Sequence, residues 1–339
     1  MRPQENISLR PYNTFGIDAK ARYFISVNSV EELQLALALD EYPDKFILGG
    51  GSNMLLVSDV EALVLHINLK GVSEVERQGD RLVLKVMAGE NWHDLVLWTM
   101  QHDLGGLENL SLIPGNTGTA PIQNIGAYGV ELKDVFHSCE AIEIETGKLQ
   151  RFSKEDCEFG YRESIFKNKA KGKFVITSVN FELSVRNHRL NTSYGAIEAE
   201  LEAMGITDPS IQDISRAVIA IRRKKLPDPA ELGNSGSFFK NPVIDADVFK
   251  GFHQKHPDAP FYKVSETAYK IPAGWLIEQC GFKGKRYGDA GVHKNQALVL
   301  VNHGNASGKE IIDLAHKIQD TVKDRFGICI SPEVNIIGD

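Results

Sequence analysis

The chain has 339 residues, 42% of them apolar and 24% charged, so it can bury more than one core and has the composition of an ordinary globular protein. Its formal net charge of -7 excludes a general nucleic-acid binder, because no excess of cations is available to neutralise a phosphate backbone. The four cysteines are widely spaced and form no CxxC pair. No apolar run has the roughly 20 residues that a transmembrane helix needs. We therefore expect a cytoplasmic protein of enzyme size without a disulfide framework, zinc site or membrane span.

The first 70 residues predict a small unit of strands around one helix. Ser29 with Glu32 three positions later is the capping-box pattern of a helix that reaches about Leu39. The apolar runs beside it predict strands at 22–27, 46–48 and 63–67. The stretch LGGGSNMLL, residues 48–56, therefore directly follows the second strand of a β-α-β unit.

Three consecutive glycines in that stretch need an explanation, because glycine makes the unfolded chain more flexible and so lowers stability. One interpretation is a tight turn between strands. The other is a nest of backbone N–H groups around an anion such as a phosphate, with the missing side chains leaving room for it. The stretch alone does not distinguish them.

The rest of the chain predicts an α+β protein. Short alternating runs predict strands, and capping and breaking residues mark the helices. The expected strands lie at 81–86, 141–145 and 297–301. Four helices are expected. The first begins near Asn91, the second spans 210–224 and the third spans 272–281. The last is capped by Ser307 and Glu310 and stops at Gly327.

A second glycine-rich stretch, IPGNTGTAPIQNIGAYG at 113–129, is almost free of charge but rich in Asn, Thr and apolar residues. Such a loop is built to be buried, and its amides and hydroxyls can bind a diphosphate and the polar edge of a heterocycle. Neither stretch matches a Rossmann or Walker pattern. Two interpretations therefore remain open: the stretches are two loops that bind one long nucleotide cofactor, or they are two structural turns.

Three further segments carry residues suited to chemistry. Ser237 in GNSGSFFKNP lies in an apolar loop without the G-x-S-x-G pattern, so it is either structural or a proton donor. Arg162 in YRESIFK and Glu333 in SPEVNIIGD lie among apolar residues and predict either a structural ion pair or an electrostatic clamp for developing charge. His253 and His256 lie among charged residues and are expected to face solvent, so we expect no metal site.

With these segments in order, the chain resembles the UDP-N-acetylenolpyruvoylglucosamine reductase family, flavoenzymes of peptidoglycan (cell wall) synthesis. The similarity runs from NTFGIDAKA at residue 13 to PEVNIIG at the end, through IPGNTGTAPIQNIGAYGVEL, YRESIF, GSFFKNP, PAGWLIEQCG and VHKNQALVLVN. Together these motifs are specific, although each alone is weak. The sequence departs from the family at Ser235, where alanine is common, and at Asn335-Ile336, where an arginine-aromatic pair is usual.

The resemblance implies an FAD-binding fold of the vanillyl-alcohol-oxidase type in two subdomains, 1–69 and 70–226 plus 327–339, with a substrate-binding lid domain at 227–326. It implies non-covalent FAD, NADPH as hydride donor and UDP-N-acetylglucosamine enolpyruvate as the substrate that becomes UDP-N-acetylmuramate. We expect a monomer that binds no nucleic acid. The implied catalytic residues are Ser237, Arg162 and Glu333.

The resemblance also carries two larger sets of residues. Those implied to bind FAD are Gly49, Gly50, Gly51, Ser52, Asn53, Met54, Pro114, Gly115, Gly118, Thr119, Ile122, Gln123, Asn124, Gly126 and Ala127. Those implied to bind substrate are Tyr194, Lys225, Asn241, Tyr262, Lys270, Lys283 and Gln296. Tyr194 in TSYGAI indicates the class of the family that folds a tyrosine-bearing loop over the substrate.

Two other functions compete with the reductase. One is another FAD-dependent oxidoreductase of this fold that acts on a sugar or alcohol, which GSFFKNP and PEV disfavour. The other is a catalytically silent protein that binds nucleotide sugars, which would be colourless when purified.

Overall fold

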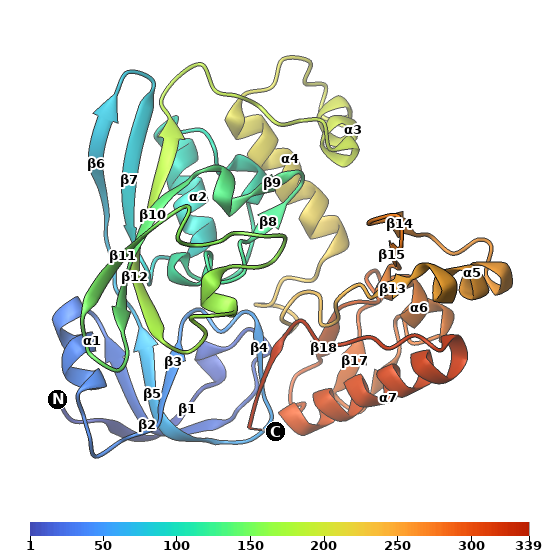
Figure 1. Cartoon of the computed structure of the whole chain (residues 1–339), viewed down its shortest axis with the longest axis horizontal. Helices are drawn as coiled ribbons and strands as arrows, with labels where there is room; N and C mark the ends of the chain where they lie inside the picture. Colours follow the sequence, from blue (N-terminus) through green and yellow to red (C-terminus); the bar gives the residue numbers. More distant parts are fainter. Residues whose placement is uncertain (339) are drawn as a thin grey trace. The chain divides into compact units, whose positions relative to one another are not determined.

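The computed structural model describes residues 1–338, which form two compact units (Figure 1). The first unit comprises Met1–Ile7, Ala21–Gly50 and Glu61–Lys224. The second comprises Ser8–Lys20, Gly51–Val60 and the chain from Lys225 onward. The boundary between them falls inside the first glycine-rich stretch. The division into three domains expected from the sequence stays a prediction.

The first unit is built on two sheets. Most of the four-stranded sheet belongs to it, in the order β1-β2-β5-β3, and the five-stranded sheet has the order β11-β10-β12-β7-β6. The strands are β1 (Gln4–Ser8), β2 (Lys20–Val27), β3 (Lys45–Leu48), β5 (Val60–Ile67), β6 (Val72–Gln78), β7 (Arg81–Met87), β10 (Phe136–Glu143), β11 (Leu149–Ser153) and β12 (Phe174–Ser184), with a short pair β8 (Gly126–Ala127) and β9 (Val130–Glu131). Strands β10 and β12 are buried along most of their length, which places the core of this unit around them.

The helices of the first unit begin largely where the capping residues predict. They are α1 (Val30–Leu37), α2 (Trp92–Gln101), α3 (Gly195–Ala203) and α4 (Ile211–Lys225), with 3-10 turns at Glu108–Leu110, Thr117–Thr119, Leu132–Asp134 and Ile165–Lys167. Asn91 caps α2 by accepting a hydrogen bond from the Asp94 N–H. Ser29 caps α1 through the N–H of Glu32, but the Glu32 carboxylate accepts from the N–H of Asn28, so only half of the predicted capping box forms.

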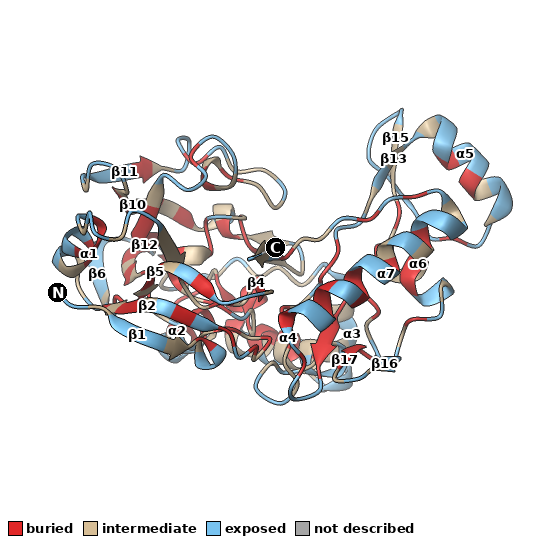
Figure 2. Ribbon diagram, turned by 90° about the horizontal axis from the view of Figure 1, so that it is seen from below, coloured by how far each residue is buried: buried red, intermediate tan, exposed pale blue. Residues whose placement is uncertain are grey.

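The second unit holds three small sheets and three helices. Its strands are β4 (Met54–Leu56), β13 (Val243–Asp245), β14 (Tyr262–Lys263), β15 (Ala268–Lys270), β16 (Arg286–Tyr287), β17 (Ala290–Val292), β18 (Leu300–Asn302) and β19 (Asn335–Ile337); its helices are α5 (Ala246–Lys255), α6 (Ala273–Gln279) and α7 (Gly308–Phe326), with a 3-10 turn at Arg10–Tyr12. Ser307 and Glu310 form the predicted capping box of α7, and Gly327 ends it in the left-handed conformation. Figure 2 shows buried residues along one side of α7, the apolar face that the sequence predicts.

Three sequence predictions need correction. The strand expected at 141–145 is β10, which ends at Glu143 because a turn closed by hydrogen bonds from Glu143 N–H and Gly147 N–H follows it. The strand expected at 297–301 begins only at Leu300, because Val299 N–H turns back to Gln296 O. The expected β-α-β unit consists of β2, α1 and β3, but β5 lies between β2 and β3 in the sheet. The two strands of the unit are therefore not hydrogen-bonded to each other.

Two of the widely spaced cysteines meet inside the first unit. Cys139 on β10 and Cys157 in the turn after β11 are fully buried, and their thiols form a hydrogen bond. This contact, followed by burial, raises the pKa of the Cys139 thiol far above its ordinary value. All four cysteines are free thiols. Sequence spacing gave no signal for this pair, because Cys139 and Cys157 lie on segments that only the sheet brings together.

We expect the four thiols to react with Ellman's reagent in separate phases, since a thiolate is the reacting form and must be accessible. Exposed Cys329 should react first and partly buried Cys280, whose pKa burial raises, more slowly. Cys139 and Cys157 should react only after denaturation. In Cys329→Ser the fast phase should vanish. Rapid labelling of all four thiols in the native protein would contradict the buried pair.

None of the helices within residues 1–338 is long and apolar enough to cross a bilayer.

Candidate active site

The two glycine-rich loops contact each other directly within the first unit. A Cβ added to Gly50 would lie 2.8 Å from Gly115 Cα and 2.9 Å from the backbone nitrogen of Asn116. A Cβ on Gly49 would lie 2.6 Å from the Thr119 methyl group. One of the two sequence interpretations was that the missing side chains leave room for an anion. The structure adds another reason, because a Cβ at position 50 would prevent the close approach of the second loop.

The packed loops present backbone donors that the protein does not use. The N–H groups of Gly49, Gly50, Gly115 and Asn116 have no hydrogen-bond acceptor within residues 1–338. The Thr117 hydroxyl is buried and also lacks a partner in this part of the chain. Unused N–H groups on adjoining loops are the donor set that binds the oxygens of a phosphate. The diphosphate of FAD therefore fits these residues by donor type.

Arg162 is held beside the second glycine-rich loop by its neighbours. Its Nη2 donates to Gly126 O at 2.6 Å, and Asn124 Nδ2 donates to Gly160 O at 2.9 Å. Arg162 has φ of 58°, a left-handed conformation that costs a non-glycine residue energy. Lys167 Nζ fixes it further through a hydrogen bond to Arg162 O at 2.7 Å. The guanidinium is thus tied to the loop by one carbonyl and keeps most of its donors for other acceptors.

The segments that carry Ser237 and Glu333 pair with each other in the second unit. Glu333 N–H donates to Phe238 O at 2.8 Å, and Lys240 N–H donates to Ser331 O at 2.9 Å, so the two segments run antiparallel. Ser237 is exposed at the start of its segment, after Gly236 in a left-handed turn. No sequence pattern indicates this contact, because it joins segments almost a hundred positions apart.

The two departures from the family pattern have structural roles. Ser235 is buried, and its hydroxyl donates to Met54 O at 3.1 Å. Asn335 Nδ2 donates to Asn53 O at 2.9 Å, where β19 pairs in parallel with β4. Asn335 therefore remains in contact with the first glycine-rich loop although it replaces a different residue type.

The expected substrate residues divide between the units. Tyr194 precedes α3 and Lys225 ends α4. Tyr262 and Lys270 are cross-strand partners on β14 and β15, so the structure brings this pair together. Lys283 is paired with Glu278 at 2.9 Å. Asn241 Oδ1 accepts from Ala273 N–H at the start of α6, and Gln296 Oε1 accepts from Leu298 N–H.

Arg222 bonds residues of the second glycine-rich stretch and its border, although it is not among the expected site residues. From the sequence, the basic run at 222–225 is either a solvated helix end or a group of cations that meets a small anionic ligand, and Lys224 fits the first interpretation because it pairs with Glu200 at the surface. Arg222 instead donates from Nε to Leu112 O at 3.2 Å, and burial lowers its pKa. Its guanidinium hydrogen-bonds Tyr128. The signal was present in the sequence, because Ser215, Val218 and Arg222 fall at helical spacing on one face.

The two histidines considered for a metal do not face solvent as expected. His253 stacks on Phe249 with 5.3 Å between ring centroids, and His256 lies edge-on to Phe326 at 5.0 Å. Across residues 1–338, no group of three His, Cys, Asp or Glu side chains is placed to hold a metal ion.

Fold and donor set together define a flavoprotein. Residues 21–153, which include both glycine-rich loops, match the model of the FAD binding domain. Residues 228–337, which include Ser237 and Glu333, match the model of the C-terminal domain of UDP-N-acetylenolpyruvoylglucosamine reductase.

Whole-chain relatives agree with these matches. UDP-N-acetylenolpyruvoylglucosamine reductase of Flavobacterium johnsoniae is 60% identical over 337 residues, 99% of this chain and 100% of its own. The enzyme of the same name from Pseudomonas putida is 49% identical, over 98% of each chain. The chain belongs to the UDP-N-acetylenolpyruvoylglucosamine reductase family.

A solved structure of the reductase (MurB) from Thermus caldophilus has the same fold, with a TM-score of 0.69 over 99% of both chains at 24% identity. The predicted α+β FAD-binding fold is confirmed, and so are the predicted FAD-dependent reductase of peptidoglycan synthesis and its cofactors FAD and NADPH. The individual site residues stay predictions.

Proposed function

We propose that this chain reduces UDP-N-acetylglucosamine enolpyruvate to UDP-N-acetylmuramate with NADPH, as a cytoplasmic monomer, and that Ser237, Arg162 and Glu333 are its catalytic residues. The observation that supports this assignment of roles is the hydrogen bond from Glu333 N–H to Phe238 O, which brings the segment of Glu333 alongside the segment of exposed Ser237. A hydroxyl and a carboxyl group on two paired segments suit a reaction that ends with a proton transfer.

FAD would be bound by the two glycine-rich loops, Gly49 to Met54 and Pro114 to Ala127. When bound, FAD supplies the hydride that NADPH has given it to C3 of the enolpyruvyl group. The unused N–H groups of Gly49, Gly50, Gly115 and Asn116 would receive the diphosphate oxygens. The hydrogen bond from Arg162 to Gly126 O would hold the arginine beside this cofactor loop.

Charge stabilisation is assigned to Arg162 and Glu333. Hydride addition at C3 places negative charge on C2 and on the attached carboxylate. The free donors of the Arg162 guanidinium would stabilise that charge electrostatically, a contribution of roughly 10²- to 10³-fold in rate for one such donor group. Glu333 would form a hydrogen bond with the enolic carboxylate. An ionised carboxylate can only accept hydrogen bonds, so Glu333 would have to donate this bond from its protonated form.

Ser237 would donate the proton to C2. Ser237 is exposed, whereas the hydroxyl of neighbouring Ser235 already donates its hydrogen bond to Met54 O. Ser237 is therefore the serine of this segment that can reach a substrate. The alkoxide left on Ser237 needs a proton in turn. Lys240, on the same segment, and Lys225 are the cations that we assign to this relay.

The substrate would be bound by Tyr194, Lys225, Asn241, Tyr262, Lys270, Lys283 and Gln296. The lysines among them would neutralise the carboxylate and the diphosphate of the sugar nucleotide, which explains cations in an acidic protein. Residues 227–326 would then form the substrate-binding domain of the three-domain division.

The reaction can be tested in two separate steps under anaerobic conditions. NADPH added to the purified yellow protein should bleach the flavin absorbance. The enolpyruvyl sugar nucleotide added next should restore it in one turnover, with UDP-N-acetylmuramate as the product. Flavin that bleaches but is not reoxidised by this substrate would refute the proposal. Rapid turnover of an alcohol or sugar with oxygen and without NADPH would instead favour an oxidase.

A further inference from the structure

The segment that carries Tyr194 has no helix or strand of its own. It spans residues 185–194, between the end of β12 and the start of α3. Tyr194 lies at its end and is 52% exposed. A segment of this kind keeps its place only through contacts to its surroundings. Its first residues, Val185, Arg186 and Asn187, bond Asp80, and three further sets of contacts hold the residues that follow.

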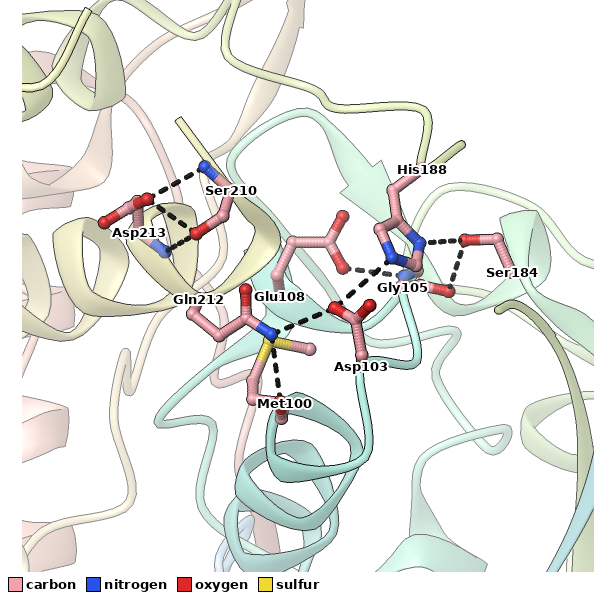
Figure 3. A network of polar contacts seen from close by, with 10 residues as sticks. Met100, Asp103, Gly105, Glu108, Ser184, His188, Ser210, Gln212 and Asp213 are labelled. Carbon is pink, nitrogen blue, oxygen red and sulfur yellow. Dashed lines mark hydrogen bonds and ion pairs between the residues drawn. The ribbon is translucent and has the colours of Figure 1, made fainter. Parts of the chain in front are cut away.

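The first set holds the beginning of the segment (Figure 3). His188 Nδ1 lies 2.7 Å from Ser184 Oγ, and His188 Nε2 lies 3.5 Å from Asp103 Oδ1. Gln212 Nε2 on α4 donates to the same Asp103 Oδ1 at 3.2 Å. The imidazole therefore ties this end of the segment to the turn after α2.

The second set holds the middle of the segment and consists of one buried side chain. Asn109, in the 3-10 turn Glu108–Leu110, is 1% exposed. Its Nδ2 donates to Tyr128 O at 3.1 Å and to Asn191 O at 2.9 Å. Both hydrogens of one amide group therefore join the second glycine-rich stretch to the tyrosine-bearing segment.

The bonds of Asn109 are specific to its amide nitrogen. Its Oδ1 is buried without a hydrogen-bond partner among residues 1–338. A buried oxygen without a partner lowers the stability of the fold. The advantage of asparagine over an apolar residue at this position therefore lies in the two bonds that its Nδ2 donates. They also act at a constrained point, because Tyr128 has φ of 50°, a left-handed conformation that must be held by its neighbours.

The third set holds the end of the segment. The rings of Tyr194 and Tyr128 meet edge to face with centroids 5.5 Å apart. Tyr128 also bonds the Arg222 guanidinium. Asn191 Nδ2 adds a bond to Gly129 O at 3.3 Å. The position of Tyr194 therefore depends on the same turn, 128–129, whose backbone Asn109 fixes.

We propose that Asn109 is a positioning residue for substrate binding: it holds the tyrosine-bearing segment in register with the flavin-binding loop, so that Tyr194 is in place before the substrate arrives. Asn109 would act through its bonds to Tyr128 and Asn191 and not as a cofactor or substrate ligand. This inference rests on the proposed function for the role of Tyr194, but the contacts themselves can be tested without it.

The test compares Asn109→Asp with the matched variant Asn180→Asp in the full-length FAD-loaded protein. Asn180 is also buried, donates from Nδ2 to Ser138 Oγ at 2.8 Å, and has an Oδ1 without a partner among residues 1–338, but its donated bond runs to β10 and not to the second glycine-rich stretch or the segment 185–194. In Asn109→Asp a carboxylate faces two carbonyl oxygens, so both donated bonds are lost and replaced by repulsion. In Asn180→Asp only the stability of the sheet should change.

Two readouts separate positioning from a general loss of structure. Trypsin can cleave after exposed Arg186 and Arg189, and cleavage of the native protein there should rise about tenfold or more in Asn109→Asp but not in Asn180→Asp. KM for the enolpyruvyl substrate should rise on the order of tenfold, while flavin reduction by NADPH stays within about twofold. Asn109→Ser keeps one donor, so its rate of trypsin cleavage and its KM should fall between those of wild type and Asn109→Asp. This variant replaces Asn109→Asp in the test if the aspartate variant does not fold.

Unchanged proteolysis and unchanged KM in both Asn109 variants would overturn the proposal. Equal loss of flavin reduction and of substrate reduction would also overturn it, because Asn109 would then act on the cofactor loop alone. If the wild-type protein does not reduce the enolpyruvyl substrate, the proposed function fails, whereas the difference in proteolysis still decides whether Asn109 holds the segment.

Discussion

Ser237→Ala is expected to slow reoxidation of the reduced flavin by the enolpyruvyl substrate about 10²- to 10⁴-fold, the usual contribution of a positioned general acid. Reduction of the flavin by NADPH should stay within about twofold, because that half of the reaction requires no proton from Ser237. Stopped-flow absorbance of the flavin measures both rates separately. The alanine also leaves the backbone bond from Glu333 N–H to Phe238 O intact, so the neighbouring carboxylate keeps its place.

Ser235→Ala is the matched control for this experiment. Ser235 lies two residues away, but its hydroxyl is buried against Met54 O. Its loss should lower the free energy of unfolding by about 1 kcal/mol, the typical contribution of one hydrogen bond, and leave the proton step unchanged. If Ser237→Ala slowed both half-reactions equally, or Ser235→Ala matched it, Ser237 would not be the proton donor.

Gly50→Val is expected to yield protein that has lost most of its flavin. A Cβ at this position would lie within 2.9 Å of the backbone of Gly115 and Asn116, so the two loops must separate before the valine fits. Overpacking of this kind costs about 1–3 kcal/mol, which is roughly ten- to hundredfold in the affinity for FAD if the separated loops no longer bind it. The ratio of flavin to protein absorbance after purification and titration with free FAD measure this loss.

Gly251→Val provides the matched control. Gly251 lies on α5, and a Cβ there would meet no atom within 4 Å. This variant should keep its full flavin content, since valine is tolerated in a helix at least as well as glycine. A Gly50→Val protein that purifies with a full complement of FAD would show that the contact between the loops is not needed to bind the cofactor.

Local features of the fold followed from short-range sequence patterns. The caps of α2 and α7 form at Asn91 and Ser307 because a side-chain oxygen and the N–H that it accepts from lie three residues apart. Strand ends were less predictable. At Glu143 and Val299 the apolar pattern continues, but a turn hydrogen bond redirects the backbone.

The site was predictable only in part, for a related reason. Motif matching named residues on separate segments. The contact of Gly50 with Gly115, the antiparallel pairing of the segments of Ser237 and Glu333, and the bridge made by Asn109 all join residues distant in sequence. Pairings of this kind depend on the packing of the whole unit and leave no periodic signal. Arg222 is the exception, since its place on the buried face of α4 follows from helical spacing.

The interleaved composition of the second unit has a consequence for the synthesis of the protein. Residues 8–20 and 51–60 leave the ribosome early, yet they belong to a unit otherwise formed from residue 225 onward. Strand β4, which includes Met54, must wait for its partner β19 and for Gly308, which packs against Leu56 O, before it can be buried. Pairings over such separations form slowly. The second unit therefore cannot complete its fold until β19 has been synthesised, and a fragment that begins at Lys225 lacks strand β4 and residues 8–20.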